Sequence, residues 1–176
     1  TSGIGLILQD IDISPKKIVP TDKVIVSGSI GDHGIAVMAK RNGLIFNPPI
    51  ISDTQPLNGL IKEILLSYSG AIHAMRDPTR GGLATTLKEI AQEASVCIEV
   101  EEDKIPIKQQ VRGACELLGL DPLYVASEGV IVAFVSENMA KCILAAMKKH
   151  PFGKDAEIIG EVKLSPKGMV LMKTKI

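Results

Sequence analysis

The 176-residue chain carries 20 basic and 20 acidic side chains, so its formal net charge is zero, and 45% of its residues are hydrophobic. Aromatic residues make up only 3% and Trp is absent, which argues against nucleic-acid binding through a broad basic surface and stacking rings. No apolar run approaches the roughly 20 residues of a membrane helix and no basic-then-apolar leader is present, so we expect a cytoplasmic protein without membrane contacts.

The first half of the chain predicts one strand and three helices. Residues 24–28 form a β-branched run that ends at a glycine, and apolar residues at helical spacing follow from Ile35. Residues 57–65 show the i, i+3, i+4, i+7 stripe of an amphipathic helix, which we expect to end near Gly70. Residues 83–94 have the same period, so a third helix follows a pair of glycines.

The second half alternates strands with two further helices. Helices are expected at residues 111–118, where Gly119 ends the first, and at 138–149. Strands are expected at residues 96–100, 130–135, 157–162 and 169–172. The last two strands flank Pro166-Lys167-Gly168, which predicts a terminal β-hairpin. About six strands among long helices predict a single domain over residues 1–176, an α/β (α+β) sandwich with a mixed sheet.

The segment Met75-Arg76-Asp77-Pro78-Thr79-Arg80-Gly81-Gly82-Leu83 leads into the third helix. Asp77 and Pro78 suit an N-cap and a first helical position. Two glycines cost a first helical turn roughly 1 kcal/mol each relative to alanine, so their presence needs a reason. One reason is close approach of the backbone to a phosphate, with Arg76 and Arg80 as charged donors. The alternative is a helix cap with small residues for packing.

A second candidate is Gly28-Ser29-Ile30-Gly31-Asp32-His33-Gly34, where a strand passes through spaced glycines into a helix. The segment is similar to a phosphate-binding turn but matches neither the dinucleotide pattern nor the Walker A loop. Asp32 and His33 are able to hydrogen-bond a ligand, and either is equally able to cap the helix. An ordinary strand-to-helix turn therefore stays open as an alternative.

The third candidate is Glu128, which lies in Ala126-Ser127-Glu128-Gly129 just before a predicted strand. A carboxylate beside a glycine at the mouth of a strand is suited to serve as a base or a metal ligand, and a solvated turn is the alternative. The histidines and cysteines show no zinc spacing, whereas Mg²⁺ held with nucleotide phosphates needs only one or two carboxylates. We expect the three cysteines to be reduced, buried small hydrophobes: Cys97, Cys115 and Cys142.

Taken together, these motifs resemble the C-terminal domain of the HypE family of hydrogenase expression/formation proteins, over essentially the whole chain. HypE belongs to the superfamily of aminoimidazole ribonucleotide synthetase, selenophosphate synthetase and thiamine monophosphate kinase. Besides the two glycine-containing segments and Glu128-Gly129, the resemblance rests on further runs of sequence. These are Val111-Arg112-Gly113, Cys115-Glu116-Leu117-Leu118-Gly119-Leu120-Asp121-Pro122-Leu123-Tyr124, His150-Pro151-Phe152-Gly153-Lys154-Asp155-Ala156 and Ile159-Gly160-Glu161-Val162.

The resemblance implies a two-domain enzyme with ATP and Mg²⁺ held mostly by an N-terminal half that this chain lacks. The family takes a carbamoyl group from the carbamoyltransferase HypF onto its own C-terminal cysteine. It then uses ATP to dehydrate that group to a thiocyanate, which passes to the HypC–HypD complex as cyanide for the iron of [NiFe] hydrogenase. The resemblance also implies a homodimer of the full-length protein. We expect the fragment alone to be inactive.

When the site residues of the family are matched to this sequence, Glu128 resembles the carboxylate that lies near the reacting amide. The resemblance places Arg80, Gly81 and Gly82 on the phosphate side, with a ligand-facing role also for Asp77. It places Asp32, His33 and Gly34 at the cleft. The chain departs from the family in two ways: it ends without the terminal Pro-Arg-Ile-Cys, and Ser127 stands where Asn is usual. Another ATP-dependent synthetase or kinase of the superfamily, or a non-catalytic docking domain, is the alternative.

Overall fold

The structure is a computed structural model that describes residue 4 and residues 11–174. The described residues form five α-helices: α1 (Asp32–Asn42), α2 (Asn58–Tyr68), α3 (Gly82–Ala94), α4 (Gln109–Leu118) and α5 (Glu137–Lys149). They also form six strands: β1 (Lys23–Val26), β2 (Ile72–Arg76), β3 (Cys97–Glu101), β4 (Val132–Val135), β5 (Glu157–Lys163) and β6 (Met169–Lys173). No helix among these residues is long and apolar enough to cross a membrane.

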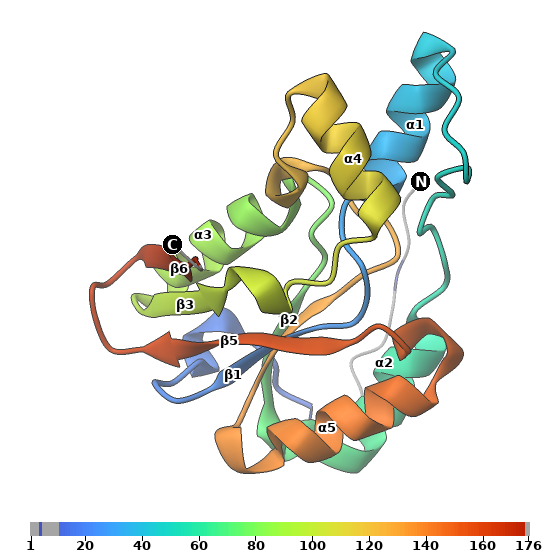
Figure 1. The fold of residues 1–176 in the computed structure, drawn as a ribbon. Coiled ribbons are helices and arrows are strands. Elements are labelled where there is room, and N and C mark those ends of the chain that lie inside the picture. Colours follow the sequence, from blue (N-terminus) through green and yellow to red (C-terminus); the bar gives the residue numbers. More distant parts are fainter. Residues whose placement is uncertain (1–3, 5–10, 175–176) are drawn as a thin grey trace.

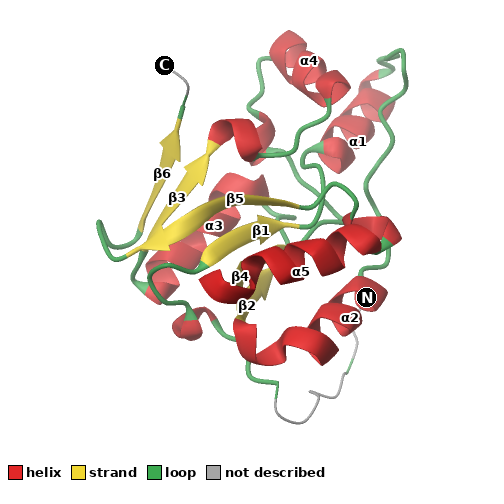
Figure 2. Cartoon of the chain, turned by 60° about the horizontal axis from the view of Figure 1, so that its bottom comes forward, coloured by secondary structure: helices red, strands yellow, loops and turns green. Residues whose placement is uncertain are grey.

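One mixed sheet forms the middle layer, with the strand order β2-β4-β1-β5-β3-β6. All neighbouring strands are antiparallel except β3 and β6, which run parallel. Helix α3 packs on one face of this sheet, and helices α2 and α5 pack on the other (Figures 1 and 2). The sandwich of helices on a mixed sheet, predicted from the sequence, is therefore confirmed.

Strand β1 shows why both faces of the sheet are covered. Val24 and Val26 point into the core under α3, whereas Ile25 between them packs with the residues of α2 and α5. All three side chains are fully buried, because alternate residues of a strand face opposite sides and both sides are apolar here. Helices α1 and α4 stand apart from these layers at the top of Figure 1 and share a small core of their own.

The predicted terminal hairpin is wrong. Strand β6 pairs in parallel with β3 and not with β5, since β3 lies between the two. After β5 the chain crosses to the free edge of β3, where the N–H of Gly168 donates to the carbonyl of Val96 at 2.7 Å and Lys88 Nζ donates to the carbonyl of Gly168 at 2.6 Å. One edge of β3 is already bonded to β5, so β6 can pair only with the other.

Strand β2 was not assigned from the sequence. Ile72 and Ala74 are buried, whereas His73 and Met75, which alternate with them, are only partly buried. The strand is five residues long and contains one β-branched residue, so its local signal is weak. In the folded chain β2 pairs with β4, whose four residues are all buried, and it forms one edge of the sheet.

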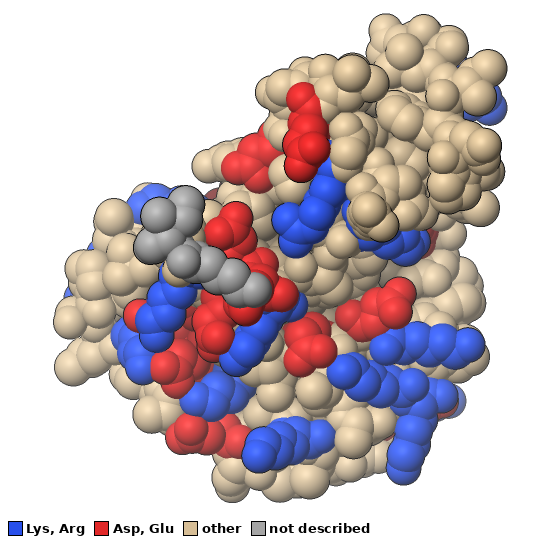
Figure 3. Space-filling model, viewed as in Figure 1, with Lys and Arg blue, Asp and Glu red and all other residues tan. Residues whose placement is uncertain are grey.

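A ladder of charged side chains runs across strands β1, β5 and β3. Glu161 of β5 lies opposite Lys23 of β1 and Glu99 of β3. Its carboxylate accepts from Lys23 Nζ at 2.6 Å and pairs with Lys163, and Glu99 pairs with Lys173 at 2.6 Å. Figure 3 shows acidic and basic side chains interleaved on this side of the molecule.

The charge ladder predicts a pH-dependent contribution to stability. Lys163 and Lys23 lower the pKa of Glu161 from its ordinary 4.5 to about 2, mainly through their hydrogen bonds. A carboxyl group whose pKa is lower in the folded than in the unfolded chain stabilises the fold at pH values above its unfolded pKa. This contribution is lost as the pH falls from about 4.5 towards 2. Solvent screens the pair, so Glu161→Gln is expected to cost about 1 kcal/mol at neutral pH.

Urea unfolding of the 176-residue chain at pH 7 and pH 3 measures this contribution. The difference between wild type and Glu161→Gln is expected to shrink at the lower pH. The exposed Glu63 of α2 offers a matched control, since Glu63→Gln removes a carboxylate with no ion pair among the described residues. An equal difference at both pH values would contradict the assignment to the ionised form of Glu161.

Candidate functional site

The three segments singled out in the sequence meet at one buried residue, Ser127. Its Oγ accepts the backbone N–H of Gly31 at 3.0 Å, and its own N–H donates to the carbonyl of Pro78 at 3.2 Å. The hydroxyl of Thr79 donates to the Ser127 carbonyl at 3.2 Å. Ser127 is fully buried, and its hydroxyl and backbone provide hydrogen-bond partners for the two neighbouring loops.

Asp32 begins helix α1 and is 1% exposed. It does not cap the helix, because the N-cap position is taken by Gly31 in a left-handed conformation with φ of 83°. Asp32 Oδ1 instead accepts from Lys108 Nζ at 2.7 Å, and its Oδ2 is buried without a hydrogen-bond partner among the described residues. The carboxylate is therefore directed into the protein and toward Lys108.

His33 and Gly34 follow Asp32 in the first turn of α1. The Nδ1 atom of His33 lies 2.9 Å from Ser52 Oγ and 3.3 Å from Thr54 Oγ1. The N–H of Gly34 donates to the carbonyl of Ala126 at 3.0 Å, and a Cβ atom there would lie 3.2 Å from the Ala126 nitrogen. In the structure His33 therefore contacts the loop that contains Ser52 and Thr54. Position 34 leaves no room for a side chain, because the first turn of α1 packs directly on the backbone of Ala126.

Glu128 has an exposed side chain, and its backbone is held by residues 51–55. The N–H of Glu128 donates to Asp53 Oδ1 at 2.8 Å, and Gln55 Nε2 donates to the carbonyl of the next residue, Gly129, at 2.8 Å. The carboxylate of Glu128 makes no hydrogen bond or ion pair with the described residues. It is thus free to meet a ligand while its backbone is fixed.

Asp53 was not among the site residues predicted from the sequence. Burial raises the pKa of its carboxyl group, and the negative charge of Asp32 raises it further, while the backbone N–H groups of Glu128 and His33 act in the opposite direction. Like that of Asp32, the Oδ2 atom of Asp53 is buried without a partner among the described residues. Residues 51–55 have no helical or strand period and no motif, so no local signal marks Asp53.

The start of helix α3 differs from the prediction. Asp77 and Pro78 do not cap it, because the helix begins at Gly82 and Gly81 occupies the N-cap position. Both glycines have positive φ angles, 70° at Gly81 and 66° at Gly82. A Cβ atom on Gly82 would lie 2.8 Å from the Val125 carbonyl oxygen and still closer to that of Leu123. Backbone packing thus accounts for Gly82 without a phosphate.

A hollow of about 300 Å³ lies beside this loop, lined by Arg76, Asp77, Thr79, Arg80, Thr86 and Glu89. Arg76 is neutralised by Glu89, with Nη2 and Oε2 2.8 Å apart. Arg80 is exposed and has no ion pair among the described residues, which makes it the available cation of the loop. Of the two arginines suggested as donors to a ligand, Arg80 is the better placed.

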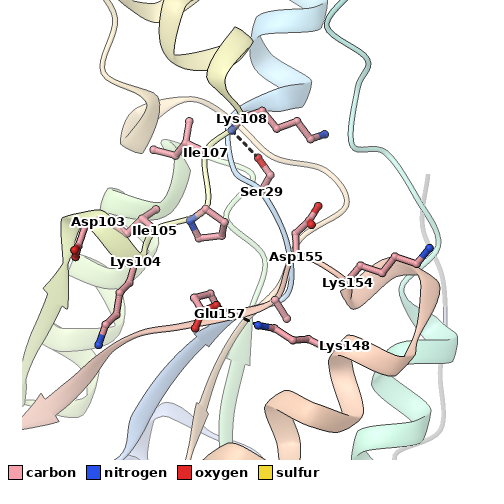
Figure 4. Close-up of a pocket in the computed structure, with 12 residues that line it drawn as sticks. Ser29, Asp103, Lys104, Ile105, Ile107, Lys108, Lys148, Lys154, Asp155 and Glu157 are labelled. Carbon is pink, nitrogen blue, oxygen red and sulfur yellow. Dashed lines mark hydrogen bonds and ion pairs between the residues drawn. The ribbon is translucent and has the colours of Figure 1, made fainter.

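A larger cleft runs past Asp32 and Asp53. One part has a volume of about 430 Å³ and is lined by both aspartates, and an adjoining part of about 610 Å³ continues toward α5. The two parts share Ser29, Lys108, Lys154 and Asp155. Figure 4 shows Lys108, Ser29 and Asp155 grouped near the middle, where the Lys108 N–H donates to Ser29 Oγ at 3.3 Å. Lys108 is already paired with Asp32, so Lys154, which has no ion pair among the described residues, is the lysine of this cleft that remains able to attract an anion.

The cysteines lie away from this cleft. Cys97 and Cys115 are buried, as predicted, and burial raises the pKa of both thiols, so neither is an activated nucleophile. Cys142 is exposed, which corrects the prediction that it is buried. Within the described ranges no three His, Cys, Asp or Glu side chains are grouped closely enough to hold a metal ion.

Comparison with protein families matches residues 19–173 to the model described as "AIR synthase related protein, C-terminal domain". The chain belongs to this family. Among curated relatives, this AIR synthase related domain is 46% identical over 174 residues to the carbamoyl dehydratase HypE of Bradyrhizobium diazoefficiens and 41% identical over 162 residues to that of Escherichia coli K12. These alignments cover 99% and 92% of the chain, but only 50% and 48% of the relatives.

Solved structures confirm the resemblance of the AIR synthase related domain to HypE. A crystal structure of a HypE–HypF complex matches with 47% identity and a TM-score of 0.89, over 93% of this chain and 53% of that one. A crystal structure of HypE in complex with ATP matches with 40% identity and a TM-score of 0.91. The match covers 96% of this chain and 52% of that one. Thiamine-monophosphate kinase from Stenotrophomonas maltophilia shares the fold, with 20% identity and a TM-score of 0.63. This match covers 95% of this chain and 54% of the kinase chain.

Proposed function

We propose that this chain is the C-terminal domain of a HypE-like enzyme that uses ATP to dehydrate a carbamoyl group on a terminal cysteine to a thiocyanate. The observation that supports the proposal most is the meeting of three family segments at Ser127, in a chain 46% identical to HypE over 99% of its length. The chain spans about half the length of such relatives, so the activity belongs to the longer protein.

In this proposal Glu128 is the base. Its carboxylate is exposed, its backbone N–H is bonded to Asp53, which lines the cleft, and in this role it accepts a proton from the nitrogen of the carbamoyl group. ATP, when bound, supplies the phosphoryl group that turns the amide oxygen into a leaving group. Loss of two N–H protons and of that oxygen as phosphate converts the thiocarboxamide to the thiocyanate.

The charged residues of this chain fit one side of a site for ATP. Lys154 lines the cleft without an ion pair among the described residues, Lys108 lines it while paired with Asp32, and Arg80 is the available cation of the loop before α3. The cleft also contains Asp32 and Asp53, whose negative charges oppose binding of bare phosphates. We therefore assign most of the ATP contacts, and Mg²⁺ with them, to an N-terminal half of the enzyme.

The same proposal includes the partners. A HypF-like carbamoyltransferase would deliver the carbamoyl group, and a HypC–HypD complex would receive the cyano group. The crystal structure of the HypE–HypF complex supports the first of these partners. We further propose that the full-length enzyme is a cytoplasmic homodimer and that the reacting cysteine follows this domain.

Calorimetric titration with Mg-ATP tests whether the site is shared between two domains. The full-length protein is expected to bind at least about tenfold more tightly than the 176-residue chain, a difference of about 1.4 kcal/mol. The thermal midpoint of the 176-residue chain, recorded with and without Mg-ATP, gives a second measure of binding, because a ligand raises the midpoint only of a protein that binds it. Equal affinities for the two proteins would overturn the shared site.

A further inference from the structure

Residues 51–55 form a segment that lies directly on Glu128 and Gly129. Asp53 Oδ1 accepts the Glu128 N–H at 2.8 Å, and Gln55 binds the Gly129 carbonyl at 2.8 Å. A Cβ atom on Gly129 would overlap the carbonyl oxygen of Asp53, so the two backbones are in direct contact. The main chain on both sides of the Glu128 side chain is therefore set by this segment.

The same segment is tied to the first turn of helix α1. Ser52 Oγ lies 2.9 Å from Nδ1 of His33 and accepts the backbone N–H of Thr54 at 3.2 Å. Thr54 Oγ1 lies 2.8 Å from Ser52 Oγ. These bonds tie the residues on either side of Asp53 to the first turn of α1.

Stability alone does not explain a carboxylate at position 53. One oxygen is used by Glu128, and the other is buried without a partner among the described residues, near the negative charge of Asp32. Burying an unpaired oxygen and placing two acids close together both oppose folding. What a carboxylate adds is a stronger hydrogen bond to the Glu128 N–H than a neutral acceptor makes.

We propose that Asp53 is a positioning residue of the dehydration reaction, which fixes the Glu128 backbone and so places the Glu128 carboxylate against the carbamoyl nitrogen. Asp53 acts through Glu128 and does not touch the substrate. The inference rests on the proposed function, since it needs Glu128 to be the base.

A double-mutant cycle in the full-length enzyme tests this role. The cycle compares wild type, Asp53→Ala, Glu128→Ala and the double variant, with thiocyanate on the terminal cysteine measured by mass spectrometry. Asp53→Ala is expected to lower kcat at least about tenfold while leaving KM for ATP unchanged, because misplacing a reacting group slows chemistry more than binding. In the Glu128→Ala background the same change is expected to cost less than about twofold.

Three further variants complete the test. Asp53→Asn keeps an oxygen acceptor for the Glu128 N–H, but a neutral and weaker one, and is expected to recover part of the lost rate. Gln55→Ala, which releases Gly129 from the same segment, is expected to lower kcat in the same pattern and replaces Asp53→Ala if that variant does not fold. Glu63→Ala on α2, which removes an exposed carboxylate without an ion pair among the described residues, is the control and is expected to match wild type.

Two outcomes would overturn the positioning role. One is an unchanged kcat in Asp53→Ala, and the other is a loss of the same size with and without Glu128. An inactive wild-type enzyme, or full activity of Glu128→Ala, would instead remove the proposed function itself. The two failures are therefore distinguishable.

Discussion

Replacing Glu128 by Gln in the full-length enzyme is expected to lower kcat for carbamoyl dehydration by about 10²–10⁴-fold. The amide has nearly the shape of the carboxylate but cannot accept a proton at neutral pH. The side chain is exposed and makes no hydrogen bond with the described residues, so the thermal midpoint is expected to stay close to that of wild type. Single-turnover conversion of a carbamoylated terminal cysteine, followed by mass spectrometry, measures the rate.

Glu128→Asp and Glu63→Gln are the matched controls. Glu128→Asp keeps a base on a shorter side chain and is expected to retain more activity than the amide. Glu63→Gln removes an exposed carboxylate from α2 and is expected to leave the rate unchanged. Normal dehydration by Glu128→Gln together with weakened partner binding would show that this domain serves only for docking.

Gly82→Ala is expected to be the most destabilising change in the loop before α3. The added Cβ would press on the carbonyl oxygens of Leu123 and Val125, which are backbone atoms and cannot swing aside. The residue would also keep a φ of 66°, which costs an L-residue roughly 1–2 kcal/mol. With about 1–3 kcal/mol for overpacking, the total is about 2–5 kcal/mol, or roughly 4–20 °C in thermal midpoint.

Gly113→Ala provides the matched glycine control in the same chain. Gly113 lies inside helix α4, and no atom lies within 4 Å of a Cβ built there. Alanine in place of a glycine within a helix is expected to stabilise by about 0.5–1 kcal/mol. Differential scanning calorimetry of both variants gives the comparison, and similar midpoints for Gly82→Ala and wild type would contradict the packing argument.

Local pattern predicted the helices and most strands well. The amphipathic stripe of residues 57–65 became α2, and Gly119 ends α4 in a left-handed conformation. Such features depend on residues only a few positions apart, and periodicity within a short window of sequence is enough to predict them. The misplaced cap at Asp77 has the same origin: both glycines before α3 adopt left-handed geometry, so the helix starts later than its capping residues suggest.

The sequence by itself determined the helices, the family resemblance and the candidate residues of three separate segments. Tertiary structure decided which of them meet, because the bonds that join them span long distances in the chain. Gly31 and Ser127 are 96 positions apart, and Asp53 and Glu128 are 75 apart. It also decided that β6 pairs with β3, since only the assembled sheet shows which strand edge is free. No local period carries such information, whereas packing and hydrogen bonding in the folded chain do.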